Sequence, residues 1–370
     1  MGVKKLHIVL GSIALVSVGA YLFSTGAAQP IAPALRLGVL VSDSGPLYFA
    51  GEYQRAATKL AIADLAKASE PLKVNVTFLD LGDSTYEFEN AREKLDDFRA
   101  DVLLAPIESS SAVRLLKTTG NQPVIATAAI AEKIENQSPV YRLAPTQSQE
   151  VIALAQYIVD SNAQSVAIVF SDDEYGKSTL RSLAMAFALR GIGKVQVVPL
   201  SEYSRVIKTK LDALVLATME QSLGFFAEYA KFPNKPKQLY LVPGNLASYS
   251  NYPWANQVKG ALGLFSQTDV PDSFRNRLAA YMKRPAVKTT TNPIVTLSYL
   301  TYRAVMISGE SFLKAGGNFT PRLRTALLES ESNGVRNFTG QGIAYRDKYS
   351  VYQYSAKGSY SVIGEYEPKQ

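Results

Sequence analysis

The sequence predicts an α/β protein of two doubly wound lobes, each a parallel sheet covered by helices on both faces. Three observations predict this fold. The chain has 370 residues, whereas an ordinary domain holds roughly 100–200. Short apolar segments alternate with amphipathic segments of helical period, which is typical of parallel sheets. The alternation starts again at Ser165, which predicts a second sheet.

The residues before Ser165 predict four strands with helices between them. The strands are expected over 35–41, 74–81, 101–106 and 123–127. The helices are expected over 54–66, 87–98 and 109–116. In the first helix Ala57, Leu60, Ala61 and Leu65 fall on one face, the apolar stripe that packs on a sheet.

The second set of segments repeats this layout. Strands are expected over 165–170, 212–218 and 238–243, and helices over 178–189 and 222–231. Val41-Ser42-Asp43 aligns with Phe170-Ser171-Asp172, each at a strand end, which favours an internal duplication of the layout.

The C-terminal part has a different pattern. Helices are expected over 293–315 and 321–328. Residues 349–354 then alternate in side-chain character and are rich in Tyr, which predicts antiparallel strands near the C-terminus.

The N-terminus predicts export. Lys4 and Lys5 precede an apolar run, Leu6–Phe23, which is followed by small residues. This order is typical of a secretory signal, with cleavage expected after Ala28. The run is also barely long enough to span a bilayer, so an uncleaved membrane anchor is the alternative. In both cases the rest of the chain is expected in the periplasm. In the second case it would be anchored to the inner membrane.

Composition excludes several classes of protein. There is no Cys, and the one His is His7, inside the predicted leader. Disulfides, thiolate metal sites, Ser-His-Asp hydrolases and nearly all zinc enzymes are therefore excluded from the exported part. No nucleotide-binding glycine motif is present. We expect no enzyme activity, no metal and no cofactor.

Charge argues against nucleic acid as a partner. The 39 Lys and Arg exceed the 32 Asp and Glu by seven, and loss of Lys4 and Lys5 with residues 1–28 leaves +5. The positive charge is spread along the chain, without a run of basic residues that would bind nucleic acid. We therefore interpret it as favouring solubility.

The candidate ligand site lies in the loops that follow the strands. Ligands of open parallel sheets bind beyond the carboxyl ends of the strands. Hydroxyls and free N–H groups at helix N-termini suit an anion, and aromatic rings can enclose a planar group. The candidates from these loops are Ser44, Tyr48, Phe49, Ser109, Ser110, Tyr175, Glu220 and Asn245. Residues 109–111 are also expected as helix N-caps, and capping alone is the alternative for them.

With these residues in view, the chain resembles the type I periplasmic binding proteins over residues 34–366. It is most similar to the leucine/isoleucine/valine-binding branch that serves ABC importers. The resemblance depends on the order and spacing of short pieces. These are Leu37-Gly38-Val39-Leu40, Ser44-Gly45-Pro46, Gly51, Ala105-Pro106, Ser109-Ser110-Ser111, Tyr141-Arg142-Leu143-Ala144-Pro145-Thr146, Val166-Ala167-Ile168-Val169, Tyr175-Gly176 and Phe338-Thr339-Gly340-Gln341-Gly342.

The resemblance implies two lobes joined by three crossovers that close on a ligand. Lobe one would be 34–144 plus 270–345, and lobe two 145–269 plus 346–366. By the family's pattern Ser109 and the backbone of Ala129 would hold a ligand carboxylate, and Tyr175 would contact the ligand from lobe two.

Three departures from that pattern bear on the ligand. Ile130 replaces an expected hydroxyl, Ala50 replaces an aromatic residue, and Gly244-Asn245 stands where an acidic residue would meet an ammonium group. A buried ammonium without a carboxylate is costly, and Glu220 is the one candidate replacement. An α-amino acid is therefore disfavoured; an amide, an aromatic acid, a short peptide or no small ligand stay open.

The sequence thus predicts an extracytoplasmic solute-binding protein. It would capture a small polar or amino-acid-like ligand between the lobes and deliver it to the membrane subunits of an ABC transporter. The alternative is a membrane-tethered periplasmic regulator or sensor of the same fold that acts on another membrane protein. An enzyme is disfavoured because the exported part lacks His and Cys.

Overall fold

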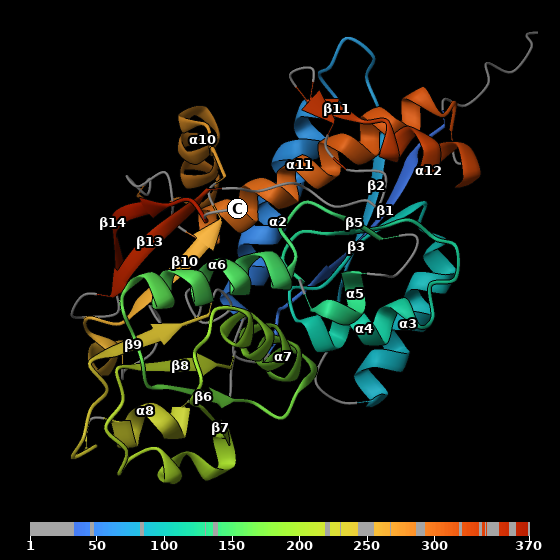
Figure 1. Ribbon diagram of the computed structural model, residues 1–370. Coiled ribbons are helices and arrows are strands. Elements are labelled where there is room, and N and C mark those ends of the chain that lie inside the picture. Colours follow the sequence, from blue (N-terminus) through green and yellow to red (C-terminus); the bar gives the residue numbers. More distant parts are fainter. Residues whose placement is uncertain are drawn as a thin grey trace, which may run out of the picture. The chain divides into compact units, whose positions relative to one another are not determined.

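The computed structural model contains two larger sheets, one of five strands and one of seven, and both lie within residues Ala34–Gln370 (Figure 1). The structure describes residues 33–44, 48–81, 85–129, 131–135, 140–218, 223–229, 231–242, 255–266, 268–285, 293–317, 320–332, 335–336, 338, 348–354 and 360–368. The predicted leader, 1–28, lies outside these residues. Within them no helix is both long and apolar enough to cross a membrane.

The first sheet is parallel throughout, in the strand order β2-β1-β3-β4-β5. Its strands are β1 (Leu35–Val41), β2 (Val74–Asp80), β3 (Val102–Leu104), β4 (Val124–Ala126) and β5 (Val140–Arg142). The helices that connect them are α2 (Tyr48–Leu65), α3 (Thr85–Phe98), α4 (Ser109–Leu116) and α5 (Glu132–Glu135). The predicted parallel sheet is confirmed.

Alternation along β1 explains why both faces of this sheet are covered. Leu37 and Val39 pack in an apolar cluster with residues of α2 and of the later helix α11 (Pro293–Lys314). Leu40 packs in a separate cluster with residues of α3 and α4. Successive side chains of a strand point to opposite faces, so a strand buried on both sides is apolar throughout.

The second sheet has the order β14-β13-β10-β9-β8-β6-β7. Its parallel strands are β6 (Val166–Phe170), β7 (Val195–Pro199), β8 (Ala213–Ala217), β9 (Gln238–Leu241) and β10 (Leu262–Ser266). Strand β13 (Tyr349–Tyr354) is antiparallel to both β10 and β14 (Tyr360–Tyr366), which confirms the predicted antiparallel pairing of the tail.

Helices also cover both faces of the second sheet. Helices α6 (Gln147–Asp160) and α7 (Glu174–Leu189) contribute to the cluster that contains Ile168 and Val215. Helix α8 (Leu223–Tyr229) contributes Phe225 and Phe226 to the cluster on the other face, with Leu214. The short 3-10 helices η1 (Leu200–Arg205) and η3 (Ala255–Val258) lie on that side too.

The chain passes between the sheets after β5, after β10 and after α12. Helix α10 (Asp272–Met282) packs on α2, as does α11, and α12 (Thr320–Leu328) packs on α11. A small ladder pairs β11 (Glu331–Ser332) with β12 (Val335–Arg336). This layout agrees with a two-lobed α/β fold, while the lobe boundaries given above stay a prediction.

Two helix starts were predicted too late, for the same reason. Helix α2 begins at Tyr48 instead of residue 54, and α7 at Glu174 instead of residue 178. Each contains a glycine in its first turns, Gly51 or Gly176, which in a sequence resembles loop punctuation. Close packing requires both glycines. A Cβ on Gly51 would lie 2.4 Å from the Ser42 carbonyl oxygen, and one on Gly176 would lie even closer to the Ser171 carbonyl.

Candidate ligand site at the carboxyl ends of the strands

Ser109 is held by a contact to the loop after β4. It is the first residue of α4 and is buried. Its Oγ accepts the backbone N–H of Ala131 at 3.2 Å. A hydroxyl that accepts one bond can still donate its proton. Ser109 and Ala129, both predicted to hold a carboxylate, are thus joined through neighbouring backbone, and Ala129 is buried as well.

The expectation that residues 109–111 cap α4 is wrong. The N-cap is Glu108, whose extended backbone (φ −72°, ψ 124°) precedes the helix and whose side chain makes no capping bond. The Ser109 hydroxyl is directed to Ala131 instead. β3 ends at Leu104 and α4 already starts at Ser109, so Ser109 lies inside the helix instead of capping it.

Tyr175 lies in the first turn of α7, on the other sheet, and is buried. The N-cap of α7 is Asp173, whose carboxylate accepts the N–H of Gly176 at 2.7 Å. The Tyr175 carbonyl accepts a bond from the buried Gln147 Nε2 at 3.1 Å. Gln147 also bonds the hydroxyl groups of Ser178 and Thr179, so α6 fixes the start of α7.

The carboxyl edges of the two sheets meet here. Helix α4, which follows β3, contacts α7, which follows β6. An ion pair joins Lys133 Nζ of α5 to Glu174 Oε2 of α7 at 2.5 Å. The Lys133 side chain is 60% exposed, so solvent weakens the attraction. The structure therefore brings the segments of Ser109, Ala129 and Tyr175 together.

Other predicted residues are exposed or lie outside the described part. Tyr48 is 60% exposed and meets the half-buried Phe49 edge to face, with 6.1 Å between ring centroids. Ser44 and Ser110 are exposed. Glu220 and Asn245 lie outside the described residues. All nine assignments to the ligand stay predictions.

Sequence reasoning did not select three hydroxyl groups that stand at strand ends. Ser42 follows β1, Ser171 follows β6 and Thr218 follows β8. All three are buried, and none has a hydrogen-bond partner among the described residues. The Ser171 N–H donates to the Ala217 carbonyl at 3.2 Å, so Ser171 lies at the end of the neighbouring strand. The Ser-Asp pair that recurs at 42–43 and 171–172 was the signal that could have identified Ser42 and Ser171.

Glu150 was also missed. It lies in the first turns of α6, just after the first passage between the sheets, and is buried. The N–H of Ser266, the last residue of β10, donates to Glu150 Oε1 at 3.5 Å. The hydroxyl of Tyr349, at the start of β13, donates to the Gln149 carbonyl at 3.2 Å. Burial raises the pKa of the Glu150 carboxyl to about 8. The chain's passages between the sheets thus meet around one buried acid.

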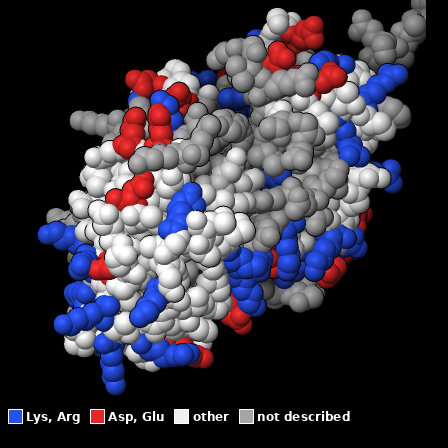
Figure 2. All heavy atoms as spheres, in the orientation of Figure 1, with Lys and Arg blue, Asp and Glu red and all other residues white. Residues whose placement is uncertain are grey.

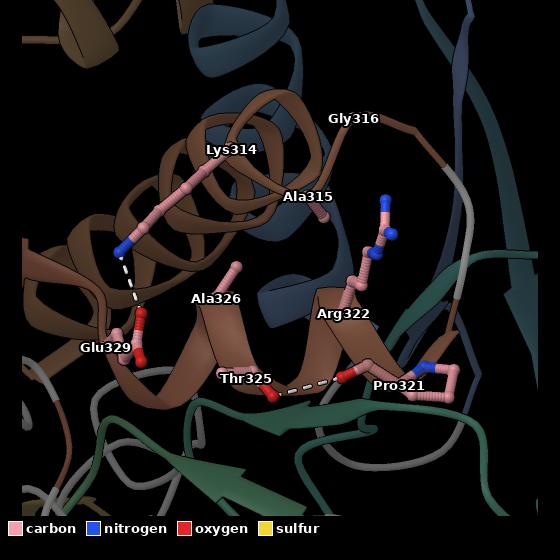
Figure 3. A pocket seen from close by; sticks show the side chains of 8 residues that line it. All are labelled: Lys314, Ala315, Gly316, Pro321, Arg322, Thr325, Ala326 and Glu329. Atoms are coloured by element: carbon pink, nitrogen blue, oxygen red, sulfur yellow. Dashed lines mark hydrogen bonds and ion pairs between the residues drawn. The ribbon is translucent and has the colours of Figure 1, made fainter.

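Two pockets flank α12, away from these strand ends. One of about 570 Å³ lies between the end of α11 and α12. Lys314 and Glu329 form an ion pair of 3.0 Å on one side of it, and Ala315 and Ala326 contribute small apolar side chains (Figure 3). The other, of about 470 Å³, lies at the amino ends of β1 and β3.

Among the residues that the structure describes, no group of three or more His, Cys, Asp and Glu side chains could hold a metal ion. On the face shown in Figure 2, Lys and Arg stand in several groups, with Asp and Glu among them.

The fold is shared with solved solute-binding proteins. One from R. palustris, in complex with benzoate, has 15% identity and a TM-score of 0.74, with 90% of this chain and 97% of that chain covered. The leucine-binding protein LivK from Thermotoga maritima has 15% identity, a TM-score of 0.73 and coverage of 90% and 99%. LivJ from Streptococcus pneumoniae, in complex with isoleucine, has 14% identity, a TM-score of 0.72 and coverage of 90% and 100%.

No curated protein sequence matches the chain. The family model for periplasmic binding proteins, in contrast, matches residues 34–350. That range includes both sheets up to the start of β13 and all the candidate site residues. The chain therefore belongs to the periplasmic binding protein family.

Proposed function

We propose that this chain is the solute-binding component of an ABC importer and that it holds a small polar ligand between its two lobes. The contact between α4 and α7 carries the proposal. Ser109 begins α4 and Tyr175 lies in the first turn of α7, and each helix follows a parallel strand, β3 or β6, of its own sheet. Ligands of open α/β sheets bind beyond the carboxyl ends of such strands. Family membership supports a location outside the cytoplasm. Cleavage of the leader after Ala28 is a separate part of the proposal.

A carboxylate suits the first lobe's part of this site. The N-terminal turn of α4 offers backbone N–H groups to an anion. The Ser109 hydroxyl already accepts the Ala131 N–H. Among the described residues, no side chain or carbonyl accepts the proton of the Ser109 hydroxyl. That O–H is available to donate to a ligand oxygen.

The other end of the ligand is expected to lack an ammonium group. By the family's pattern, Ile130 and Asn245 stand where an amino-acid ligand would meet a hydroxyl and a carboxylate. Leaving an ammonium unpaired in a closed site is costly. Relatives of this fold include one in complex with benzoate and one in complex with isoleucine. We therefore rank an aromatic acid such as benzoate above leucine.

Calorimetric titration of benzoate and of leucine tests the site. We expect saturable binding of benzoate and weaker or no binding of leucine. Ser109→Ala should weaken benzoate binding by roughly 1–3 kcal/mol if the hydroxyl bonds a buried carboxylate. Tyr175→Ala should weaken it as well, and Ser201→Ala, at an exposed serine of η1 outside the site, serves as the control.

Because Ser109 also supports Ala131, the denaturation midpoint of each variant is measured in parallel. Loss of affinity in a variant that remains folded supports the proposal. Unchanged affinity in both Ser109→Ala and Tyr175→Ala would remove these residues from the site.

A further inference from the structure

We propose that the carboxyl group of Glu150 is a proton-dependent conformational switch at the place where the chain passes between the two sheets. While Glu150 holds its proton, the three passages stay packed together. Loss of the proton loosens them and changes the orientation of one sheet relative to the other. No ligand is needed for this motion, so the inference does not depend on the function proposed above.

The position of Glu150 is the first argument. It lies in α6, just after the first passage, whereas Ser266 ends β10 before the second passage and Tyr349 begins β13 after the third. The Ser266 N–H donates to Glu150 Oε1 at 3.5 Å, and the Tyr349 hydroxyl donates to the carbonyl of the adjacent Gln149 at 3.2 Å. The first turn of α6 therefore bonds to residues at the other two passages, and element ends of this kind are where hinges form.

The elements packed on α6 direct their charged side chains elsewhere. Helix α6 packs on α7 and on β10, and β10 contains no ionisable side chain. The charged side chains at the start of α7, those of Glu174, Lys177 and Arg181, form ion pairs with one another or with residues outside α6. Arg190, after the end of α7, donates to Gln156 Oε1 at 2.9 Å, farther along α6.

Ionisation of Glu150 is therefore unfavourable in the packed arrangement. Burial raises the pKa of its carboxyl to about 8, and the bonds from Ser266 offset only part of this effect. The buried Arg142, ahead of the first passage, donates to the Ile134 carbonyl at 2.6 Å and is not among the groups that shift this pKa. A buried carboxylate without a cation is costly, and contact with water relieves the cost. As the pH rises through about 8, the favoured arrangement is one in which the start of α6 has moved away from β10 or β13.

Polar atoms that water can bond are already present at the passages. The hydroxyl groups of Thr268, two residues after Ser266, and of Ser350, next to Tyr349, are buried and have no hydrogen-bond partner among the described residues. A buried water needs roughly two to four polar partners, and these hydroxyls can join the carboxylate in supplying them. If the solute site is formed by both lobes, as proposed above, its affinity would depend on the same proton.

The test measures the distance between the sheets by double electron–electron resonance, without ligand. The chain has no Cys, so two introduced cysteines are the only labelling sites in residues 29–370, which include the compact unit Ala34–Gln370. The pair Lys94→Cys/Ala188→Cys labels exposed positions of α3 and α7, on different sheets. The control pair Ala188→Cys/Ser201→Cys labels two exposed positions on the second sheet alone.

We expect the distance between the sheets to shift by about 2 Å or more from pH 6 to pH 9, while the control pair does not change. Glu150→Gln, which stays uncharged, should abolish the shift. Glu150→Met, also uncharged and of similar length, is the second variant for the case that Glu150→Gln does not fold. Glu365→Gln, at an exposed position of β14, should leave the shift intact.

Three results would overturn the switch. One is an equal distance between the sheets at both pH values, and another is a shift that persists in the Glu150 variants. The third is loss of the folded circular dichroism signal of the parent at pH 9, because ionisation would then unfold the chain instead of turning the sheets. Since no solute is added, failure of this test leaves the proposed function standing, and the reverse also holds.

Discussion

The buried carboxyl group of Glu150 makes stability depend on pH in a defined window. Burial raises its pKa from 4.5 to about 8. Between these values the folded protein keeps a proton that the unfolded chain has lost. The stability that this proton contributes is complete below about pH 4.5 and is lost as the pH rises through about 8. We expect Glu150→Gln, which stays neutral, to have the higher melting temperature at pH 9 and little advantage at pH 5.

The control for this prediction is Glu93→Gln, on an exposed position of α3. Melting temperatures of both variants and the parent are compared at pH 5, 7 and 9. An advantage of Glu150→Gln that does not grow with pH, or one that Glu93→Gln shares, would contradict the account of Glu150.

Gly176 tests the close approach of α7 to the end of β6. A Cβ here would collide with the carbonyl oxygen and hydroxyl of Ser171, and backbone atoms cannot yield as a flexible side chain can. We expect Gly176→Ala to lower the free energy of unfolding by about 1–3 kcal/mol, as overpacking does. Gly193→Ala is the matched control, because nothing lies within 4 Å of its Cβ position. Equal denaturation midpoints for the two variants would show that the loop after β6 can move.

The sequence could predict which candidate residues follow the ends of strands. The sequence placed Ser109 and Tyr175 in segments that follow strands, and the structure has them there. Ser109 begins α4, whereas Tyr175, expected in a loop, lies in the first turn of α7. The sequence did not predict that Ser109 accepts the Ala131 N–H or that Gln147 holds the Tyr175 carbonyl. These bonds join residues 22 and 28 positions apart. Periodicity within one segment contains no information on such contacts.

At the scale of elements, α5 and α7 form the connection that a ligand-driven closure would use. Lys133→Met should weaken affinity for the bound acid by less than about fivefold, because an exposed pair contributes at most about 1 kcal/mol. The effect should shrink in 1 M NaCl, where screening is strong. Titration calorimetry at two salt concentrations measures it.

Lys177→Met is the control for this ion pair. Lys177 pairs with Asp172 at 2.8 Å, within the loop and helix of the second sheet alone. It should leave affinity unchanged at both salt concentrations. Equal effects of the two substitutions would mean that Lys133 acts through total charge and not through the contact between α5 and α7.

Some elements were missed although the sequence contained a signal. Helix α6 begins with a capping box, in which the Thr146 side chain accepts the Gln149 N–H and Gln149 bonds back to Thr146. Thr-x-x-Gln before an apolar run is a known start signal. Strands β5, β7 and β10 were not predicted, and they have three, five and five residues. Strands this short contain too few residues for an alternating pattern to be recognised.

At the scale of the whole molecule, the restart of the pattern at Ser165 correctly predicted two sheets. The order of strands in them could not be derived in the same way. β13 and β14 join β10 across the insertion of α10, α11 and α12. Pairing of this kind depends on tertiary contacts, so in the sequence it rested on the family resemblance. The apolar cluster that includes Val39 of β1 and Ile168 of β6 links the two sheets into one unit.

The function proposed for this chain is the binding of a small solute. A thermal-shift screen of residues 29–370 against amino acids, amides, aromatic acids and short peptides tests it most directly. A ligand that binds the folded state alone raises the melting temperature by mass action. We expect a saturable rise for one class, with aromatic acids ahead of α-amino acids. A flat response across the panel from folded protein would contradict it.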